Sequence, residues 1–159
     1  MFEVWDLRDA GVFVGMNHVY EDAFNLLAGR QIASGMTRTV FECTVDKGLV
    51  VKVEQAEVRT HFQNLMEWFV WNRVCGTAFE KWFAPVVEIS PDGRVLLMKR
   101  VEPIGATRLP KSVPVFFTDL KPSNFGVYQG RVVACDYGSH LLMEVGMTKR
   151  LKRADWGCV

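Results

Sequence analysis

Short runs in which apolar and polar residues alternate fill much of the first hundred residues, and this pattern predicts half-buried β-strands. The first three runs are QIASG at 31–35, RTVFECTV at 38–45 and GLVVKVE at 48–54. Asp46, Lys47 and Gly48 separate the last two runs and predict a hairpin turn in which Gly48 supplies a positive φ. The pattern therefore indicates strands joined by tight turns.

Two segments have the periodicity of a helix instead. Residues 18–28 predict one helix that stops at Gly29. Residues 59–74 predict a second and stronger helix, because apolar residues recur there at helical spacing and form one stripe. The stripe consists of Phe62, Leu65, Met66, Phe69 and Val70. We expect this stripe to face the protein core.

Two further hairpins follow the second helix. One joins residues 86–90 to 94–101 through Pro91-Asp92-Gly93, and the other joins 125–127 to 131–135 through Tyr128-Gln129-Gly130. Residues 103–114 are rich in proline and glycine and predict a connector. Antiparallel hairpins around one strong helix indicate an α+β fold, with the helix packed on an antiparallel sheet.

Length and composition restrict the class of protein. The chain has 159 residues, 49% of them hydrophobic and 23% charged, which is typical of one globular domain. The net charge is +1, so charge gives no reason to expect nucleic acid or a membrane as partner. No apolar run is long enough to span a membrane, and the N-terminus lacks the pattern of a signal peptide, so we expect a cytoplasmic protein.

The cysteines and histidines do not have the spacing of a zinc site. Cys43, Cys75, Cys135 and Cys158 lie far apart, form no CxxC pair and do not cluster with histidine. Three of the four cysteines lie within apolar runs. We therefore expect reduced thiols, for the most part in the core.

The candidate chemistry lies between residues 118 and 138. The segment TDLKPSN places Asp119, Lys121 and Asn124 in a loop, and Pro122 keeps this loop from continuing a regular helix or strand. Twelve residues after Asn124, an apolar strand ends at Asp136. One carboxylate and one amide oxygen suit Mg²⁺, which takes its remaining ligands from water and phosphate.

These two motifs resemble those of eukaryotic-type protein kinases. DLKPSN is similar to the catalytic loop HRDLxxxN, and Asp136-Tyr137-Gly138 resembles the DFG motif. The resemblance implies ATP and Mg²⁺ as cofactors. It implies that Asp119 accepts the proton of the attacking hydroxyl, that Lys121 lies near the γ-phosphate, and that Asn124 and Asp136 bind Mg²⁺.

The upstream chain resembles the N-lobe of the same family, and the resemblance spans residues 30–138. IASGMTRTVF at 32–41 is similar to the glycine-rich loop and retains Gly35, but Ala33 and Arg38 stand where two further glycines are expected. A single glycine in this position also fits a simple hairpin turn. The retained Gly35 is the candidate for contact with the phosphates.

The resemblance assigns an ion pair to the N-lobe as well. Lys52 resembles the lysine of VAIK that contacts the α- and β-phosphates, and Glu67, 15 residues on, takes the place of its glutamate partner. Glu57 is the competing candidate for this glutamate. Residues 95–103 resemble the hinge strand that meets adenine. We thus expect an N-terminal extension with a helix (1–29), an N-lobe-like part (30–102) and a minimal C-lobe-like part (103–159), all in one domain.

The sequence departs from the family after the hinge. Only some 16 residues separate the hinge from Asp119, and 21 residues follow Gly138, too few for the helices that bind a peptide substrate. Phe117 and Thr118 replace the histidine and arginine of the catalytic loop. The aromatic residues within 68–83 either build the core or form a surface for a protein partner or self-association. The basic residues within 149–153 predict a solvated helix face, or a contact with phosphate.

Three functions stay open at this point. The first is a minimal kinase-like phosphotransferase that acts on a hydroxyl of a partner protein or of itself. The second is a pseudokinase-type module that keeps the nucleotide pocket and docks on a larger protein. The third is transfer of a nucleotidyl group to protein. A kinase core reduced this far is also consistent with a protein of phage or mobile-element type that acts on a host enzyme.

Overall fold

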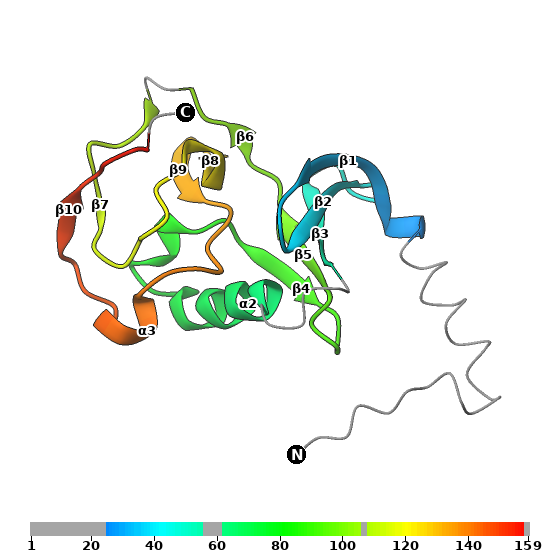
Figure 1. Ribbon diagram of the computed structural model, residues 1–159, viewed down its shortest axis with the longest axis horizontal. Helices are drawn as coiled ribbons and strands as arrows, with labels where there is room; N and C mark the ends of the chain where they lie inside the picture. The colour runs from blue at the N-terminus through cyan, green and yellow to red at the C-terminus, as the bar shows by residue number, and fades with distance from the viewer. Residues whose placement is uncertain (1–24, 56–61, 106–107, 158–159) are drawn as a thin grey trace, which may run out of the picture.

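The computed structural model describes residues 25–55, 62–105 and 108–157. Its main element is a five-stranded antiparallel sheet in the order β1-β2-β3-β5-β4 (Figure 1). The strands are β1 (Ala28–Ser34), β2 (Arg38–Cys43), β3 (Leu49–Glu54), β4 (Val86–Ile89) and β5 (Val95–Lys99). The predicted α+β class with an antiparallel sheet is confirmed.

The sheet is apolar on both faces around its central strand β3. Val50 packs with Leu96 and Met98 in the main core, while Leu49 and Val51 pack on the opposite face with Cys43. The registers Val40 to Lys52 and Arg38 to Glu54 place these four side chains on one face. Because this face also carries the main core, the cations Arg38 of β2 and Lys52 of β3 point toward the helix that covers it.

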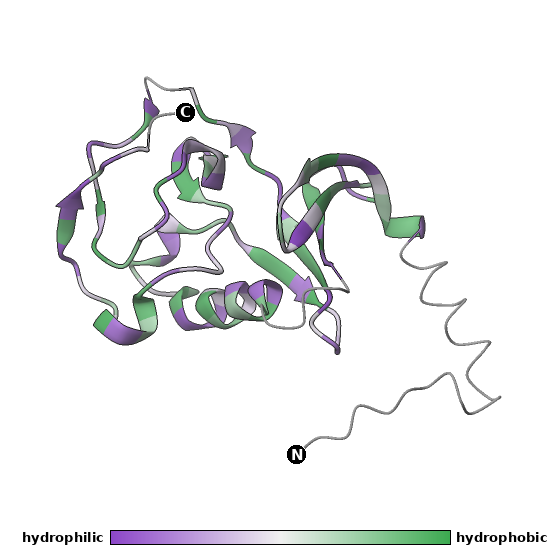
Figure 2. Cartoon of the chain, viewed as in Figure 1, coloured by the Kyte–Doolittle hydropathy of each residue, from purple (hydrophilic) through white to green (hydrophobic). Residues whose placement is uncertain are grey.

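The helix α2 (Gln63–Val74) packs against β4, β3 and β5. Its fully or nearly fully buried residues are Asn64, Glu67, Val70 and Val74. The predicted orientation of the apolar stripe is therefore wrong for two of its members, because Phe62 is 66% exposed and Phe69 is 52% exposed. Figure 2 shows hydrophobic and hydrophilic residues mixed along this helix. Polar contacts of Asn64 and Glu67, described below, fix its rotation.

The part of the chain that the structure describes also contains two small sheets in its C-terminal part and several short helices, one of which lies between α2 and β4. β6 (Glu102–Pro103), β8 (Phe125–Tyr128) and β9 (Arg131–Ala134) form one sheet, and β7 (Ser112–Pro114) pairs with β10 (Leu151–Arg153) in another. The helices are η1 (Glu80–Trp82), η3 (Pro122–Asn124) and α3 (Leu142–Val145). The β7–β10 pair lies at the end of the molecule opposite β1 (Figure 1). The basic tail is thus a paired strand and not a helix face, because β7 supplies its backbone partners.

The turns confirm the hairpins but correct one of them in detail. Gly93 and Gly130 have φ of 74° and 77° in the β4–β5 and β8–β9 turns. Gly48 is not among the glycines with positive φ; instead its amide donates to Asp46 Oδ1 at 2.7 Å, so a side chain closes that turn. Residues 25–27 are helical, as predicted, but the strand β1 already begins at Ala28, so Gly29 lies within β1; residues 18–24 of the predicted first helix lie outside the described part.

An aromatic cluster fills the core between the sheet and the C-terminal part. Phe83, 1% exposed, stacks on Phe116 at a centroid distance of 5.8 Å and meets Phe117 and Tyr137 at 5.3 and 5.0 Å. The other large aromatics of the segment 68–83 that pack against this core are half-buried: Trp68, Trp71, Phe79 and Trp82. These aromatics therefore serve mainly to build the core.

The remaining expectations concern thiols and membranes. Cys43 is buried, Cys135 is half-buried and Cys75 is exposed, and all three are free thiols. Cys158 lies outside the described residues. Within the described ranges, no helix has the length and apolar character needed to cross a membrane.

Candidate functional site

A buried ion pair joins the sheet to the helix. Lys52 Nζ on β3 lies 2.8 Å from Glu67 Oε2 and 3.0 Å from Oε1 on α2, and it also donates to the carbonyl of Cys135. Lys52 is 4% exposed and Glu67 has no exposed surface. The structure thus brings together the lysine and glutamate that the resemblance paired, while Glu57 lies outside the described residues.

A second cation, Arg38, enters the same site from β2. Its guanidinium lies 2.9 Å from Glu67 Oε2 and donates to Glu67 Oε1 at 3.0 Å, to Asn64 Oδ1 at 3.2 Å and to Asp136 Oδ1 at 2.6 Å. The residue is only 6% exposed. Arg38 therefore bridges β2, α2 and the segment that follows β9.

The segment after β9 closes the site from the other side. The backbone amide of Tyr137 donates to Glu67 Oε1 at 3.0 Å, and the Tyr137 hydroxyl donates to the carbonyl of Ala84 at 2.8 Å. At Gly138 an added Cβ would meet the end of the Gln63 side chain and lie 3.2 Å from the Gln63 Cα, so a larger residue here would require this flexible side chain to move. The sequence Asp136-Tyr137-Gly138 is thereby fixed against the helix.

The charges in this site balance one another. Arg38 and Lys52 supply two positive charges, and Glu67 and Asp136 supply two negative ones. Burial alone would raise the pKa of Glu67, but the two cations lower it below its ordinary value. Burial would likewise lower the pKa of Arg38, yet Glu67 and Asp136 raise it. Glu67 and Arg38 are therefore charged at neutral pH.

The catalytic-loop candidates form a second, more open group. Lys121 Nζ lies 3.2 Å from Asp119 Oδ2, and the side chains are 68% and 42% exposed. Asn124, at the end of η3, donates from Nδ2 to the carbonyl of Asp119 at 3.3 Å. The carbonyl of Asn124 accepts from the amides of Cys135 and Asp136 at 2.8 and 3.2 Å. The loop is thus joined to the buried network through the backbone before Asp136.

Gly35 lies apart from the side-chain contacts of the buried network. It is exposed in the turn between β1 and β2, where its amide donates to the carbonyl of Arg38 at 2.8 Å and its carbonyl accepts from Gln55 Nε2 at 3.1 Å. These contacts are those of a hairpin turn. The structure therefore gives Gly35 a role in turning the chain, and its contact with phosphates stays a prediction.

The donor atoms near Asp136 match Mg²⁺ in type but are partly engaged. Carboxylate and amide oxygens of Asp136 and Asn124 are the ligands that Mg²⁺ prefers. However, Asp136 Oδ1 already accepts a hydrogen bond from Arg38 at 2.6 Å. Among the described residues there is also no group of three or more histidine, cysteine, aspartate or glutamate side chains that could hold a metal ion. As built, the site does not fit a metal at this oxygen.

Sequence reasoning missed the roles of Arg38, Asn64 and Tyr137. The sequence predicts Arg38 only as the replacement of a glycine, because this first residue of a strand that also contains Thr39 and Glu42 gives no local sign of a buried acidic partner. Asn64 Nδ2 donates to the carbonyls of Lys52 and Arg94 at 3.2 and 2.9 Å, which ties the start of α2 to the sheet. No local pattern indicates that bond.

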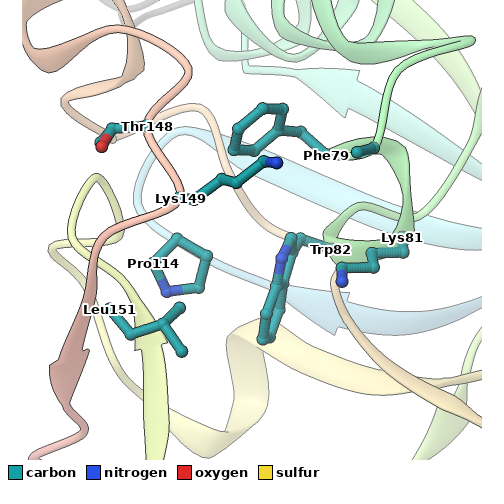
Figure 3. A pocket seen from close by; sticks show the side chains of 8 residues that line it. Phe79, Lys81, Trp82, Pro114, Thr148, Lys149 and Leu151 are labelled. Carbon is teal, nitrogen blue, oxygen red and sulfur yellow. The ribbon is translucent and has the colours of Figure 1, made fainter.

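A separate cavity of about 210 Å³ opens where the C-terminal tail meets η1 (Figure 3). The lining residues are Ala78, Phe79, Lys81, Trp82, Pro114, Thr148, Lys149 and Leu151. Lys81 Nζ lies 5.9 Å from the centre of the Trp82 ring, a distance typical of a cation–π contact. This cavity contains none of the predicted site residues.

Comparisons with known proteins found similarity to solved structures only at low sequence identity. No protein-family model and no curated protein matches the chain. The complex of APH(2″)-IIa with streptomycin and ATP aligns at 22% identity with a TM-score of 0.39, over 54% of this chain and 28% of that one. The gentamicin complex of APH(2″)-IIa aligns at 20% identity with a TM-score of 0.41, over 55% and 29%. The chain thus matches less than a third of that protein's length.

Proposed function

We propose that this chain is a kinase-like module that binds ATP between β3 and the segment after β9. The observation that carries the proposal is the buried pair of Lys52 and Glu67, beside Asp136 and the amide of Tyr137. To donate to a phosphate oxygen, Lys52 exchanges one of its three present hydrogen bonds, which go to Glu67 Oε1, Glu67 Oε2 and the carbonyl of Cys135. Lys52 binds phosphate in this proposal, and Glu67 holds it in place.

Phosphoryl transfer is the second part of the proposal. Asp119 is exposed enough to meet a hydroxyl of an incoming protein or of this chain, and it takes the proton of that hydroxyl as general base. The attacking oxygen then bonds to the γ-phosphorus while the bond from phosphorus to the β–γ bridging oxygen breaks, leaving ADP. Lys121, 3.2 Å from Asp119, contributes positive charge near the transferred group.

A change in thermal unfolding on addition of ATP tests the binding step. At 100 times its dissociation constant a ligand adds about 2.7 kcal/mol of stability, which corresponds to roughly 5–11 °C in Tm for a chain of this size. We expect this shift in the native chain and its loss in Lys52→Met. Lys47→Met, the same change at an exposed lysine in the β2–β3 turn, is the control and should keep the shift. No shift at millimolar ATP, with Mg²⁺ or with EDTA, would refute nucleotide binding.

A module that binds nucleotide without transferring phosphate is the alternative, and the hydrogen bond from Arg38 to Asp136 favours it. Labelling with γ-³²P-ATP separates the two. Transfer to the chain itself or to an added protein, lost in Asp119→Asn while the ATP-induced shift in Tm persists, supports the enzyme. A native chain that shows the shift in Tm but incorporates no label is the binding module.

A further inference from the structure

Arg38 occupies a place in which its charge competes with that of a metal ion. It stands at the position of a glycine in the loop pattern, and its guanidinium reaches Asp136, the candidate metal ligand. We propose that Arg38 is a built-in counter-ion that takes the place of a divalent cation at Asp136. This inference rests on the proposed nucleotide site, because it concerns the charge that this site presents to phosphate.

The hydrogen bonds of Arg38 leave its terminal nitrogens fully engaged. Nη1 lies 3.2 Å from Asn64 Oδ1 and 2.9 Å from Glu67 Oε2, and Nη2 lies 3.0 Å from Glu67 Oε1 and 2.6 Å from Asp136 Oδ1. Three of these four contacts are hydrogen bonds, and the contact of Nη1 with Glu67 Oε2 is an ion-pair contact. The guanidinium therefore cannot move away from Asp136 without also leaving its contacts with Glu67.

The same oxygen of Asp136 cannot serve both cations equally well. Mg²⁺ binds a carboxylate oxygen at about 2.0–2.1 Å, so an ion at Oδ1 would meet the guanidinium at close range. Both groups are positive, and because the Arg38 side chain is 7% exposed while that of Asp136 is 52% exposed, water screens their repulsion only in part. A carboxylate that is already neutralised also attracts an ion less. Arg38 consequently lowers the affinity of this site for divalent cations.

A merely structural role for Arg38 leads to a different expectation. If Arg38 only tied β2 to α2, its removal would weaken the fold and leave metal affinity unchanged. If Arg38 stands in for the metal, its removal frees Asp136 and creates a metal site. Metal affinity therefore separates the two roles, and stability alone does not.

The test uses Mn²⁺ as a paramagnetic probe on the full chain. We expect Arg38→Gln to bind Mn²⁺ at least tenfold more tightly than the native chain, with selective broadening of the amide signals of Asp136, Tyr137 and Gly138. This gain should disappear in the double variant Arg38→Gln with Asp136→Asn. Arg30→Gln is the matched control, because Arg30 pairs with Glu42 at 2.9 Å but is 76% exposed at the surface, and this variant should gain no affinity.

Mn²⁺ binding to the native chain tests the inference even if Arg38→Gln fails to fold. Broadening around Asp136 in the native chain at submillimolar Mn²⁺, lost in Asp136→Asn, would overturn the inference. Equal Mn²⁺ affinity of the native chain and Arg38→Gln would overturn it as well. If Mn²⁺ does not broaden the signals around Asp136 in the native chain, and the ATP-induced shift in Tm persists in EDTA, the result supports Arg38 as the counter-ion. Failure of ATP to bind at all refutes the proposed function and leaves the Mn²⁺ comparison intact.

Discussion

Single residues in this protein place charge inside the core and neutralise it there. Glu67 has no exposed surface, yet it contacts both Lys52 and Arg38 and accepts the amide of Tyr137. A buried carboxylate without partners would be neutral, because burial disfavours its charged form. Two cations at 2.8–3.0 Å reverse this effect. The glutamate is therefore the residue on which the site depends.

Removal of the charge of Glu67 should strongly destabilise the fold. Glu67→Gln leaves Lys52 without a buried counter-charge, and breaking a buried pair in this way costs about 3–5 kcal/mol. Urea unfolding followed by tryptophan fluorescence measures the loss. Glu102→Gln, at an exposed position in β6, is the control and should change the free energy of unfolding by less than about 0.5 kcal/mol.

The cost of Glu67→Gln should also depend on pH in a definite direction. The pKa of Glu67 is lowered in the folded state, so the folded chain holds its proton less tightly than the unfolded chain. The stability that the charge contributes is therefore fully present above the unfolded pKa of about 4.3 and is lost as pH falls through the folded pKa. We expect the difference between the native chain and Glu67→Gln to shrink below about pH 4. A difference that stays constant down to pH 2 would contradict this assignment.

Polar contacts with the sheet determine the rotation of the helix α2 about its own axis. The helix turns the face of Asn64 and Glu67 toward the sheet, where Glu54 Oε1 accepts the amide of Asn64 at 2.6 Å and Lys52 meets Glu67. This rotation leaves Phe69 half exposed. The ionic and hydrogen-bonding contacts of the inner face therefore outweigh the complete burial of every apolar side chain.

Two neighbouring substitutions test this rotation. Val70 is fully buried, so Val70→Ala should cost about 1.5–3 kcal/mol from lost burial and the cavity that remains. Phe69→Ala removes a larger side chain but one that is 52% exposed, and we expect a smaller loss than for Val70→Ala. Chemical denaturation of both variants gives the comparison. A larger loss for Phe69→Ala would mean that the apolar stripe faces the core.

The hairpins differ from α2, because residues close together in the sequence determine where the chain turns. The β4–β5 and β8–β9 turns form where Gly93 and Gly130 supply positive φ. A further glycine, Gly126 in β8, is required by packing alone, since an added Cβ would lie 2.3 Å from Val101 Cγ2 and 2.9 Å from the carbonyl of Glu102. This close approach brings the predicted hinge segment against the β8–β9 hairpin.

The whole molecule is closed by its C-terminal tail. Leu151 to Arg153 pair as β10 with β7, and beyond them Trp156 packs edge-on against Phe125 at a centroid distance of 4.9 Å. The Trp156 Nε1 donates to the carbonyl of Pro110 at 2.9 Å. The tail thus covers part of the core that the sheet and α2 leave open.

Loss of the Trp156 side chain should weaken the whole molecule. An aromatic pair contributes about 0.5–1.5 kcal/mol and a hydrogen bond about the same, so we expect Trp156→Ala to cost about 1–3 kcal/mol. Leu151→Ala is the control from the same tail, because Leu151 is 56% exposed and should cost less than about 0.5 kcal/mol. Equal Tm values for Trp156→Ala and the native chain would show that the tail does not stabilise the core.

Prediction from sequence succeeded where the relevant interactions lie close together along the chain. The strands around Val40, Lys52 and Leu96 follow from apolar residues and turn signals within a few positions. The pairing of Lys52 with Glu67 came from a resemblance between motifs. The contact of Arg38 with Asp136 escaped prediction, because 98 residues separate them and neither side chain carries a local mark of its partner.

The sequence by itself determined the strands β1 to β5, β8 and β9, the three hairpins and the α+β class, because local propensity and turn chemistry depend on neighbouring residues. A resemblance between motifs, and not propensity, singled out Lys52, Asn124 and Asp136. Only the tertiary structure decided which face of α2 is buried, that the basic tail becomes a strand, and that Arg38 neutralises Asp136. Each of these depends on partners brought together by folding, and the free energy of burying a charge is set by those partners and not by its neighbours in sequence.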